Sequence, residues 1–277
     1  MSFDTVWFLS DYGLEDEFVG VVKAVIRAIA PQVTVGDVTH QIPPHDTRAG
    51  ALALARSMQY LTLVPSVILA VVDPGVGSDR RAVAVEAGPA ANGDGSGPTA
   101  VLVGPDNGLL ASAVAMVGGA LRAVSLTNDD YHLPAPGPTF AGRDVFAPAA
   151  AHLCAGVDLA ELGELVDPIT LLPGILPISR QEEGAVQAEV LWVDRFGNVQ
   201  LNVDPDDLVL MDDPLALVLG DKTRTAVRAR TYADLRPGQI GLVTDSYGLV
   251  SIALDRRSAA EELRIHSGDA VTIRPAE

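Results

Sequence analysis

Two spacings of hydrophobic residues alternate along the first 165 residues of the chain. Apolar residues recur at intervals of three and four over residues 17–30, which is typical of an amphipathic helix packed on a sheet. Further helices are predicted at residues 47–61, 109–117 and 147–154, and strands at residues 5–9, 33–38, 67–72, 82–86 and 101–103. Strands that alternate with helices predict an α/β domain with a mostly parallel sheet covered on both faces.

The pattern changes in the last third of the chain. Pro168, Pro173 and Pro177 cannot lie inside a helix or a central strand, so residues 166–184 are predicted to form an extended, proline-rich linker. Beyond it, short strand-like runs separated by turns occur at residues 185–193, 199–203, 215–219, 239–243, 250–254 and 270–273. We therefore expect an α/β domain at residues 1–165 and a smaller all-β domain, an antiparallel barrel or sandwich, at residues 185–277.

Composition narrows the possible partners. The chain has 277 residues, of which 48% are hydrophobic and 20% charged, enough for a substantial core. Apolar runs stay below the roughly 18 to 20 residues that cross a bilayer, and residues 1–4 lack the basic start of a secretory signal, so we expect a cytoplasmic protein without a membrane partner. A net charge of −17 disfavours nucleic acid, whose binding depends on clustered Lys and Arg.

Two further features suggest structure rather than chemistry. The single cysteine, Cys154, lies in a predicted helix and is expected to be a small buried residue. The glycine-rich residues 88–97 are expected to form a connecting loop.

The most informative segment follows the apolar strand at residues 67–72. It reads Asp-Pro-Gly-Val-Gly-Ser-Asp-Arg-Arg over residues 73–81. In open α/β sheets ligands bind beyond the carboxyl ends of the strands, and the glycines and proline of this turn let a ligand approach the backbone. Asp73 and Arg80 could form an ion pair that only pins the loop, or they could act on a ligand.

Five other segments combine with this turn into a family pattern. They are residues 8–13 (Phe-Leu-Ser-Asp-Tyr-Gly), 38–40 (Val-Thr-His), 103–110 (Val-Gly-Pro-Asp-Asn-Gly-Leu-Leu), 138–148 (Pro-Thr-Phe-Ala-Gly-Arg-Asp-Val-Phe-Ala-Pro) and 194–198 (Asp-Arg-Phe-Gly-Asn). In this order they resemble the S-adenosylmethionine hydroxide adenosyltransferases, also called S-adenosylmethionine hydrolases, whose relatives include fluorinating and chlorinating enzymes. The resemblance extends from about residue 6 to about residue 275.

The resemblance implies a hydrolase that converts S-adenosylmethionine and water to adenosine and methionine. Asp11 would hold the ribose diol, although its position alone also suits a helix cap. Asp73 and Arg80 would belong to a catalytic Asp-Arg-His set that orients a water for in-line attack at the ribose C5′. The sulfonium is already a leaving group, so no cofactor or metal is expected. Halogenating relatives carry an uncharged residue at the position of Asp73, which therefore indicates water rather than a halide.

One position departs from the family pattern. The usual segment reads Pro-Thr-Phe-His-Gly-Arg-Asp, and Ala141 replaces its catalytic histidine. Alanine cannot accept a proton, so we expect binding to be intact and turnover impaired. His132 is a conceivable substitute, but it also suits an exposed loop. A protein that binds adenosine or S-adenosylmethionine without turnover is thus a second possible function, and a halide-using transferase is a third.

The resemblance also assigns the rest of the substrate pocket. Residues implied as substrate contacts are Phe140 and His45 as pocket walls, Asp194 at the methionine ammonium, Asn198 at adenine, Ser246 at the methionine end, and Phe196 within the same turn. A core aromatic and a β-hairpin turn are the structural alternatives for Phe140 and for residues 194–198. His40 is expected to make a structural hydrogen bond. Because family members place their sites at subunit junctions, we expect a homotrimer.

Overall fold

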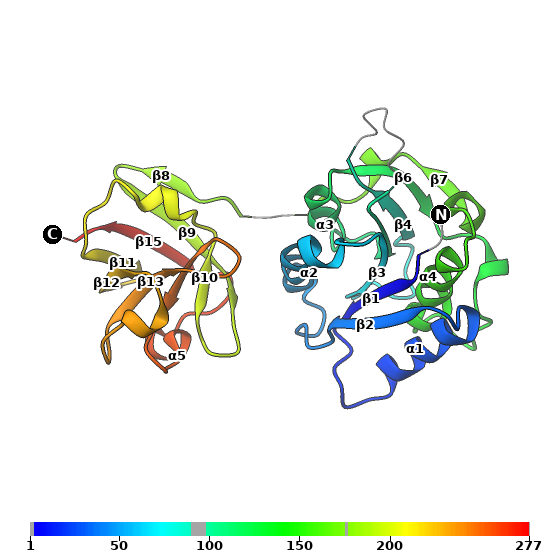
Figure 1. Cartoon of the computed structure of the whole chain (residues 1–277), viewed down its shortest axis with the longest axis horizontal. Helices are drawn as coiled ribbons and strands as arrows, with labels where there is room; N and C mark the ends of the chain where they lie inside the picture. The colour runs from blue at the N-terminus through cyan, green and yellow to red at the C-terminus, as the bar shows by residue number, and fades with distance from the viewer. Residues whose placement is uncertain (1–2, 90–97, 175–176, 277) are drawn as a thin grey trace. The chain divides into compact units, whose positions relative to one another are not determined.

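The structure is a computed structural model that describes residues 3–89, 98–174 and 177–276 (Figure 1). The chain forms two compact units, Met1–Ile175 and Leu176–Glu277. Each has a hydrophobic core of its own. Of the loop expected at residues 88–97, residues 90–97 lie outside the described part.

A seven-stranded sheet forms the centre of the first unit within the described residues, with the strand order β2-β1-β3-β5-β4-β6-β7. The strands are β1 (Thr5–Ser10), β2 (Thr34–Thr39), β3 (Ser66–Val71), β4 (Ala82–Ala87), β5 (Ala100–Pro105), β6 (Ala120–Ser125) and β7 (Glu164–Val166). Strands β2, β1, β3 and β5 pair in parallel, as the alternating pattern predicts. Strands β4, β6 and β7 extend the sheet in antiparallel pairs.

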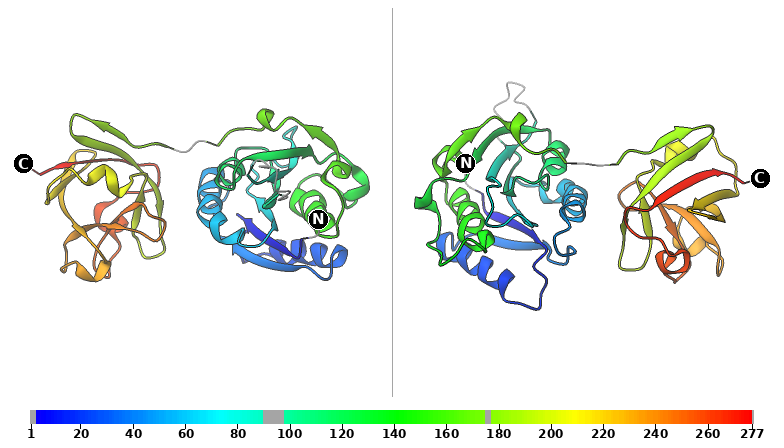
Figure 2. Two further views of the ribbon diagram at one scale, coloured as in Figure 1. Left: turned by 45° about the horizontal axis from the view of Figure 1, so that its top comes forward. Right: turned by 180° about the vertical axis from the view of Figure 1, so that it is seen from behind.

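Helices cover both faces of this sheet (Figures 1 and 2). They are α1 (Phe18–Ile29), α2 (Thr47–Leu61), α3 (Ala111–Met116) and α4 (Ala147–Cys154). Helices α1 and α4 contribute to one core cluster, and α2 and α3 to a second. Helix α1 buries Val19, Val22 and Ile26, of which Val22 and Ile26 belong to the apolar stripe that its sequence predicts. Helix α2 begins after Asp46, whose side chain accepts a hydrogen bond from the Ala49 N–H at 2.8 Å.

The register of the sheet positions the candidate residues. Ser10 at the end of β1 pairs with Val71 at the end of β3, so the turns that follow these strands leave the sheet at the same edge. The N–H of Asp11 donates to the carbonyl oxygen of Val71 at 3.4 Å. Asp11 and Asp73 therefore lie at one carboxyl edge, where parallel sheets bind ligands.

The second unit is a β-barrel rather than a sandwich. Its strands are β8 (Arg180–Glu182), β9 (Ala185–Val193), β10 (Val199–Leu201), β11 (Leu215–Leu219), β12 (Lys222–Ala229), β13 (Ile240–Thr244), β14 (Val250–Ala253) and β15 (Ala270–Pro275), with helix α5 (Ala259–Leu263) between the last two. Pairing of β10 with both β14 and β9 closes the barrel, and β8 adds to β9 outside the closure. We expected an antiparallel barrel or sandwich, but strands β12 and β13 pair in parallel, so the barrel is only mostly antiparallel.

The proline-rich residues 166–184 contain ordered elements. Val166 ends β7, Pro168–Thr170 form a short 3-10 turn, and Arg180–Glu182 form β8. The boundary between the two compact units, between residues 175 and 176, lies within this segment.

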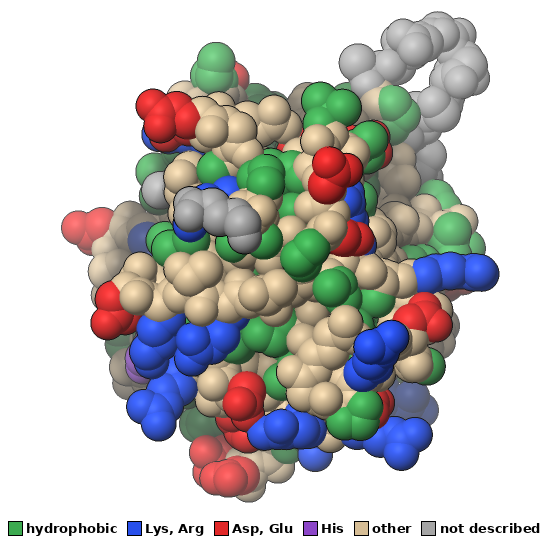
Figure 3. Space-filling view, turned by 90° about the vertical axis from the view of Figure 1, so that its left-hand side faces the viewer, with side chains coloured by type: hydrophobic (Ala, Val, Ile, Leu, Met, Phe, Trp, Pro, Cys, Tyr) green, Lys and Arg blue, Asp and Glu red, His purple; other side chains and the backbone are tan. Residues whose placement is uncertain are grey.

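The surface in Figure 3 carries Lys and Arg side chains interspersed with Asp and Glu, so the charge on this face is mixed despite the net value of −17. Within the part of the chain that the structure describes, no helix combines the length and apolarity needed to span a membrane.

Candidate functional site

Asp11 occupies the turn that follows β1. Its Oδ2 accepts a hydrogen bond from the N–H of His45, at 2.9 Å. Helix α1 has Glu17 at its N-cap and no side-chain cap, so Asp11 does not take the capping role that its sequence position allowed. The exposed His45 has a left-handed backbone with φ of 68°, and it contacts Asp11 through its main chain. The carboxylate is thus fixed at the sheet edge by the backbone of a second turn.

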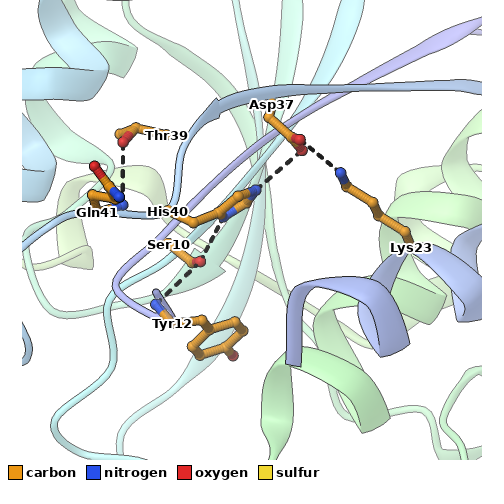
Figure 4. A network of polar contacts seen from close by, with 7 residues as sticks. All are labelled: Ser10, Tyr12, Lys23, Asp37, Thr39, His40 and Gln41. Atoms are coloured by element: carbon orange, nitrogen blue, oxygen red, sulfur yellow. Dashed lines mark hydrogen bonds and ion pairs between the residues drawn. The ribbon is translucent and has the colours of Figure 1, made fainter. Parts of the chain in front are cut away.

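A chain of polar contacts links the same turn to β2 and α1 (Figure 4). Ser10 Oγ lies 2.8 Å from His40 Nδ1, and His40 Nε2 lies 3.0 Å from Asp37 Oδ1. Lys23 Nζ donates to Asp37 Oδ2 at 2.6 Å, and the Tyr12 N–H donates to Ser10 Oγ at 3.3 Å. Because an ionised carboxylate can only accept, Nε2 is the ring nitrogen that donates to Asp37. Burial opposes ionisation of Asp37, but the hydrogen bonds from Lys23 and His40 outweigh it and lower the pKa of Asp37.

His40 contacts this region in two further ways. Its carbonyl oxygen accepts a hydrogen bond from the Gly13 N–H at 2.7 Å, and its ring packs edge-on against Phe8 with centroids 4.5 Å apart. The expected structural hydrogen bond of His40 is therefore one part of a buried support that holds residues 10–13 by side chain and main chain together.

Asp73 and Arg80 form a largely buried ion pair across the turn that follows β3. Arg80 Nε donates to Asp73 Oδ1 at 2.8 Å, and its Nη2 donates to Oδ2, which makes the contact bidentate. The two side chains are 6% and 15% exposed, respectively. The Arg80 guanidinium also lies over the Phe146 ring, 5.2 Å from its centroid. The sequence left open whether Asp73 and Arg80 pair with each other or act on a ligand. The structure shows the ion pair, at the carboxyl edge of the sheet where parallel sheets bind ligands.

The neighbouring Arg81 has a different partner. Its Nε donates to Asp106 Oδ2 at 2.8 Å, and its Nη1 donates to Thr170 Oγ1 at 3.1 Å. Asp106 Oδ1 also accepts from the N–H of Leu172 at 2.8 Å. Arg81 and Asp106 therefore hold the segment after β7 against the turns that follow β3 and β5. Only one of the two guanidinium groups of the turn after β3 pairs with Asp73.

Ala141 and Arg80 line one cavity of about 500 Å³ in the first unit. His132 and Asp144 line it as well. The His132 side chain is only 17% exposed, so the expectation of an exposed loop histidine is wrong, and its Nδ1 lies 3.3 Å from Asp129 Oδ1. The structure thus brings the alanine, the arginine and a histidine to the walls of one space.

Phe140 packs inside a cluster of aromatic rings. Its ring meets Phe18 edge-on at 5.1 Å and Tyr12 edge-on at 5.7 Å, and the Arg143 guanidinium lies 5.0 Å from its centroid. Arg143 in turn donates from Nε to Asp144 Oδ1 at 2.6 Å. Ala141 is the residue between Phe140 and a π-helical turn, Gly142–Phe146, that leads into α4.

Tyr12 lies close to the candidate residues but was not selected from the sequence. Its hydroxyl occupies the space that a side chain at Gly142 would need, 2.1 Å from an ideally placed Cβ. Burial raises the pKa of the Tyr12 phenol, and the negative charges of Asp11 and Asp73 raise it further, whereas Arg80 opposes them. The phenol therefore shares its electrostatic environment with the candidate residues. The one available signal was its place next to Asp11 in the motif.

The second unit gathers the predicted methionine-end and adenine residues. Asp194, Asn198 and Ser246 line one small cavity of about 40 Å³. Asp194 Oδ1 accepts from the N–H groups of Phe196 and Asn198 at 2.8 Å each, and its Oδ2 accepts from Asn198 Nδ2 at 2.8 Å. Residues 194–198 therefore form a hairpin turn that is held by internal hydrogen bonds, and the Asp194 carboxylate of this turn borders the cavity. Phe196 is 77% exposed and does not line that cavity.

A second carboxylate in this cavity, Asp245, was not selected from the sequence. It accepts hydrogen bonds from Gln200 Nε2 at 2.6 Å, from Ser251 Oγ at 3.1 Å and from the Tyr247 N–H at 2.8 Å. Burial, Asp194 and Asp245 together raise the pKa of Tyr232. The cavity thus presents two acidic side chains beside an aromatic one, which suits a cationic group.

The described residues contain no cluster of three or more His, Cys, Asp or Glu side chains arranged to hold a metal ion. Two family models match the chain: the SAM hydroxide adenosyltransferase N-terminal domain over residues 6–163 and the C-terminal domain over residues 188–272. The chain belongs to this family. The assignment made from the motifs is thereby confirmed.

Individual members of the SAM hydroxide adenosyltransferase family and their relatives agree along nearly the whole chain. An (R)-S-adenosyl-L-methionine hydrolase of Salinispora tropica is 44% identical over 97% of this chain and 98% of its own length. One of Thermus thermophilus is 40% identical over 95% and 96%. A fluorinase of an Actinoplanes species is more distant, at 28% over 97% of both. A crystal structure of a conserved protein from Thermotoga maritima matches with a TM-score of 0.86 and 33% identity, covering 97% of this chain and 99% of that one.

Proposed function

We propose that this protein hydrolyses S-adenosylmethionine to adenosine and methionine. Two relatives that are 40% and 44% identical over nearly their full lengths carry the name (R)-S-adenosyl-L-methionine hydrolase. The largely buried Asp73–Arg80 pair at the carboxyl edge of the sheet is the observation that carries the proposal. A halide-using reaction is disfavoured, because a carboxylate beside the nucleophile repels an anion but accepts a hydrogen bond from water.

The reaction needs positioning more than activation. The water oxygen forms a bond to the ribose C5′ while the C5′–S bond breaks, and the electron pair passes to sulfur and gives neutral methionine thioether. Asp73 would accept a hydrogen bond from this water, and Arg80 would hold the carboxylate in place. The new C5′ hydroxyl begins as a protonated alcohol, which is far more acidic than a carboxylic acid. A carboxylate paired with arginine is therefore basic enough to take its proton and pass it to solvent.

The other contacts would hold the two ends of the substrate. Asp11 would accept hydrogen bonds from the ribose hydroxyls, and Phe140 and His45 would border the ribose and adenine. Asp194 and Ser246 would meet the methionine ammonium and carboxyl end, with Asn198 and Phe196 near adenine. The charge of Asp194 and Asp245 supports this assignment, because an ammonium pairs strongly with a carboxylate in a small cavity.

We further propose a cytoplasmic homotrimer in which the two sets of residues meet at subunit junctions. The motivation is that the ribose residue Asp11 belongs to the first compact unit, and Asp194 and Ser246 belong to the second. Light scattering at working concentration should give three times the chain mass of 28.9 kDa. A monomer that still binds adenosine would disprove this assembly.

A second function, binding without turnover, is favoured by one observation. Ala141 gives the cavity beside Arg80 a methyl group where the family pattern has an imidazole. On this alternative the protein would bind S-adenosylmethionine and release it unchanged.

Product analysis separates the two functions. Incubation with S-adenosylmethionine followed by chromatography should yield adenosine and methionine in equal amounts, and Asp73→Asn should abolish most of this release. Ala141→His should raise the single-turnover rate by about a hundredfold, the scale of general acid-base assistance. Binding without any adenosine from the unchanged protein, together with release from Ala141→His, would establish the binding function instead.

A further inference from the structure

The wall of the catalytic space at residue 141 has no polar side-chain atom of its own. Ala141 directly precedes Gly142, and an ideally placed Cβ on Gly142 would lie 2.1 Å from the hydroxyl oxygen of Tyr12. A phenol oxygen therefore lies beside the residue that follows the position where the family pattern places an imidazole. The contact joins the turn after β1 to the start of the π-helical turn, two segments about 130 residues apart in the sequence.

The Tyr12 ring is fixed by its neighbours, so the direction of its hydroxyl is fixed as well. Phe18 lies 5.8 Å from it, Phe140 5.7 Å and Phe8 6.3 Å, measured between ring centroids. The Tyr12 main-chain N–H is held by Ser10 Oγ at 3.3 Å. A residue whose ring and main chain are both held loses little conformational freedom when it binds a water, which is the requirement for a positioning group in catalysis.

The charges around the phenol define its protonation state. Burial and the nearby carboxylates of Asp11, Asp73 and Asp144 raise its pKa, and the cation of Arg80 acts in the opposite direction. The hydroxyl consequently keeps its proton at neutral pH. It can accept a hydrogen bond from water and donate one to a carboxylate, but it does not act as a base.

Two polar side chains that line the cavity beside Ala141, Asp144 and His132, each have an ionic partner. Asp144 accepts two hydrogen bonds from Arg143, at 2.6 and 3.0 Å. His132 is paired with Asp129 across 3.3 Å. Tyr12 is distinguished from both by its contact with the residue that follows Ala141 and by its interaction with Asp11, Asp73 and Arg80 together.

We propose that the Tyr12 hydroxyl contacts the attacking water and orients it, the polar contact that Ala141 cannot make. This inference rests on the proposed hydrolysis. The water donates one hydrogen bond to the phenol oxygen and the other to Asp73, which leaves a lone pair directed at C5′. The phenol keeps its own proton throughout, and the proton released from the product passes to Asp73 and then to solvent.

Tyr12→Phe tests the proposal, because it removes one oxygen and keeps the ring. At saturating S-adenosylmethionine we expect the single-turnover rate to fall about tenfold to a hundredfold, with KM changed less than about twofold. Tyr60→Phe is the matched control. Tyr60 is 57% exposed on α2, outside the proposed site. The Tyr60→Phe variant should have the same single-turnover rate as the protein without substitutions. Thermal unfolding of both variants checks that the fold is kept.

The same change in an Ala141→His background makes the test specific. If the phenol takes the place of the imidazole, Tyr12→Phe should cost less than about threefold there, because the two groups serve the same water. An unchanged rate in the single variant would overturn the proposal, and so would an equal loss in both backgrounds, which is what a purely structural effect gives. If the unchanged protein releases no adenosine, the proposed hydrolysis itself fails, and that outcome is recognised before any variant is compared.

Discussion

A methyl group at residue 142 tests the position of the Tyr12 hydroxyl without any assumption about function. A Cβ on Gly142 would lie 2.1 Å from Tyr12 Oη and 3.1 Å from Cζ. Non-bonded carbon atoms are comfortable at roughly 3.5 Å, so the phenol would have to move by more than about 1 Å within the aromatic cluster. Overpacking of this kind costs about 1–3 kcal/mol. We expect Gly142→Ala to lower the free energy of unfolding by about 2 kcal/mol and the Tm by about 4–8 °C.

The double variant identifies the oxygen as the cause. With phenylalanine at position 12 the nearest atom is the ring carbon at 3.1 Å, so the cost of Gly142→Ala should fall below about 1 kcal/mol. Thermal unfolding followed by the helical circular dichroism signal gives both values. Gly20→Ala is the control: a Cβ there meets open space on helix α1, and the change should stabilise the helix by up to about 1 kcal/mol. If Gly142→Ala costs the same with tyrosine or phenylalanine at position 12, the hydroxyl does not occupy this space.

Three further changes test other parts of the structure. Asp11→Ala should weaken adenosine binding by roughly 2–4 kcal/mol, the scale of two hydrogen bonds to a charged acceptor, and unchanged affinity by calorimetry in a folded variant would exclude the ribose contact. Burial raises the pKa of the Cys154 thiol to about 12, so iodoacetamide at neutral pH should label the native protein far more slowly than the unfolded chain, as mass spectrometry will show. Burial also lowers the pKa of His152, so the unfolded state binds its proton more readily and stability should fall as the pH drops through about 6.5. His152→Gln should lessen that fall between about pH 7 and about pH 5, and an identical pH profile of urea midpoints would contradict the argument.

The sequence patterns predicted the helices and strands that bury either one face or all of their residues. The stripe of α1 and the apolar run of β3 follow directly from residue spacing, because packing on one sheet imposes that spacing. Strand β12 was missed because its sequence, Lys-Thr-Arg-Thr-Ala-Val-Arg-Ala, is largely polar and its partners on both sides supply the register. Strand β6 was missed for a similar reason: the Arg122 charge that interrupts it is paired with Glu86 on β4, at 2.7 Å. Such compensation becomes visible only when the strands are paired.

The candidate site shows the same division. Asp73 and Arg80 could be selected because they are only seven residues apart, in one turn. The environment of Tyr12 could not be predicted, because it depends on the packing of Tyr12 against Gly142, which is far from it in the sequence. Asp245 was missed because its shortest hydrogen bond comes from Gln200, 45 residues away in the sequence, and no local motif encodes that contact.

Closure of the barrel also determines how this unit can meet other chains. The edge strand of this sheet, β8, is only three residues long. Its sequence is Arg-Gln-Glu, and all three residues are exposed. A sheet edge is a template for strand addition, and short charged edges are poor templates. Association through the barrel should therefore use side-chain surfaces rather than a shared sheet, which protects the protein from growth into strand-linked aggregates.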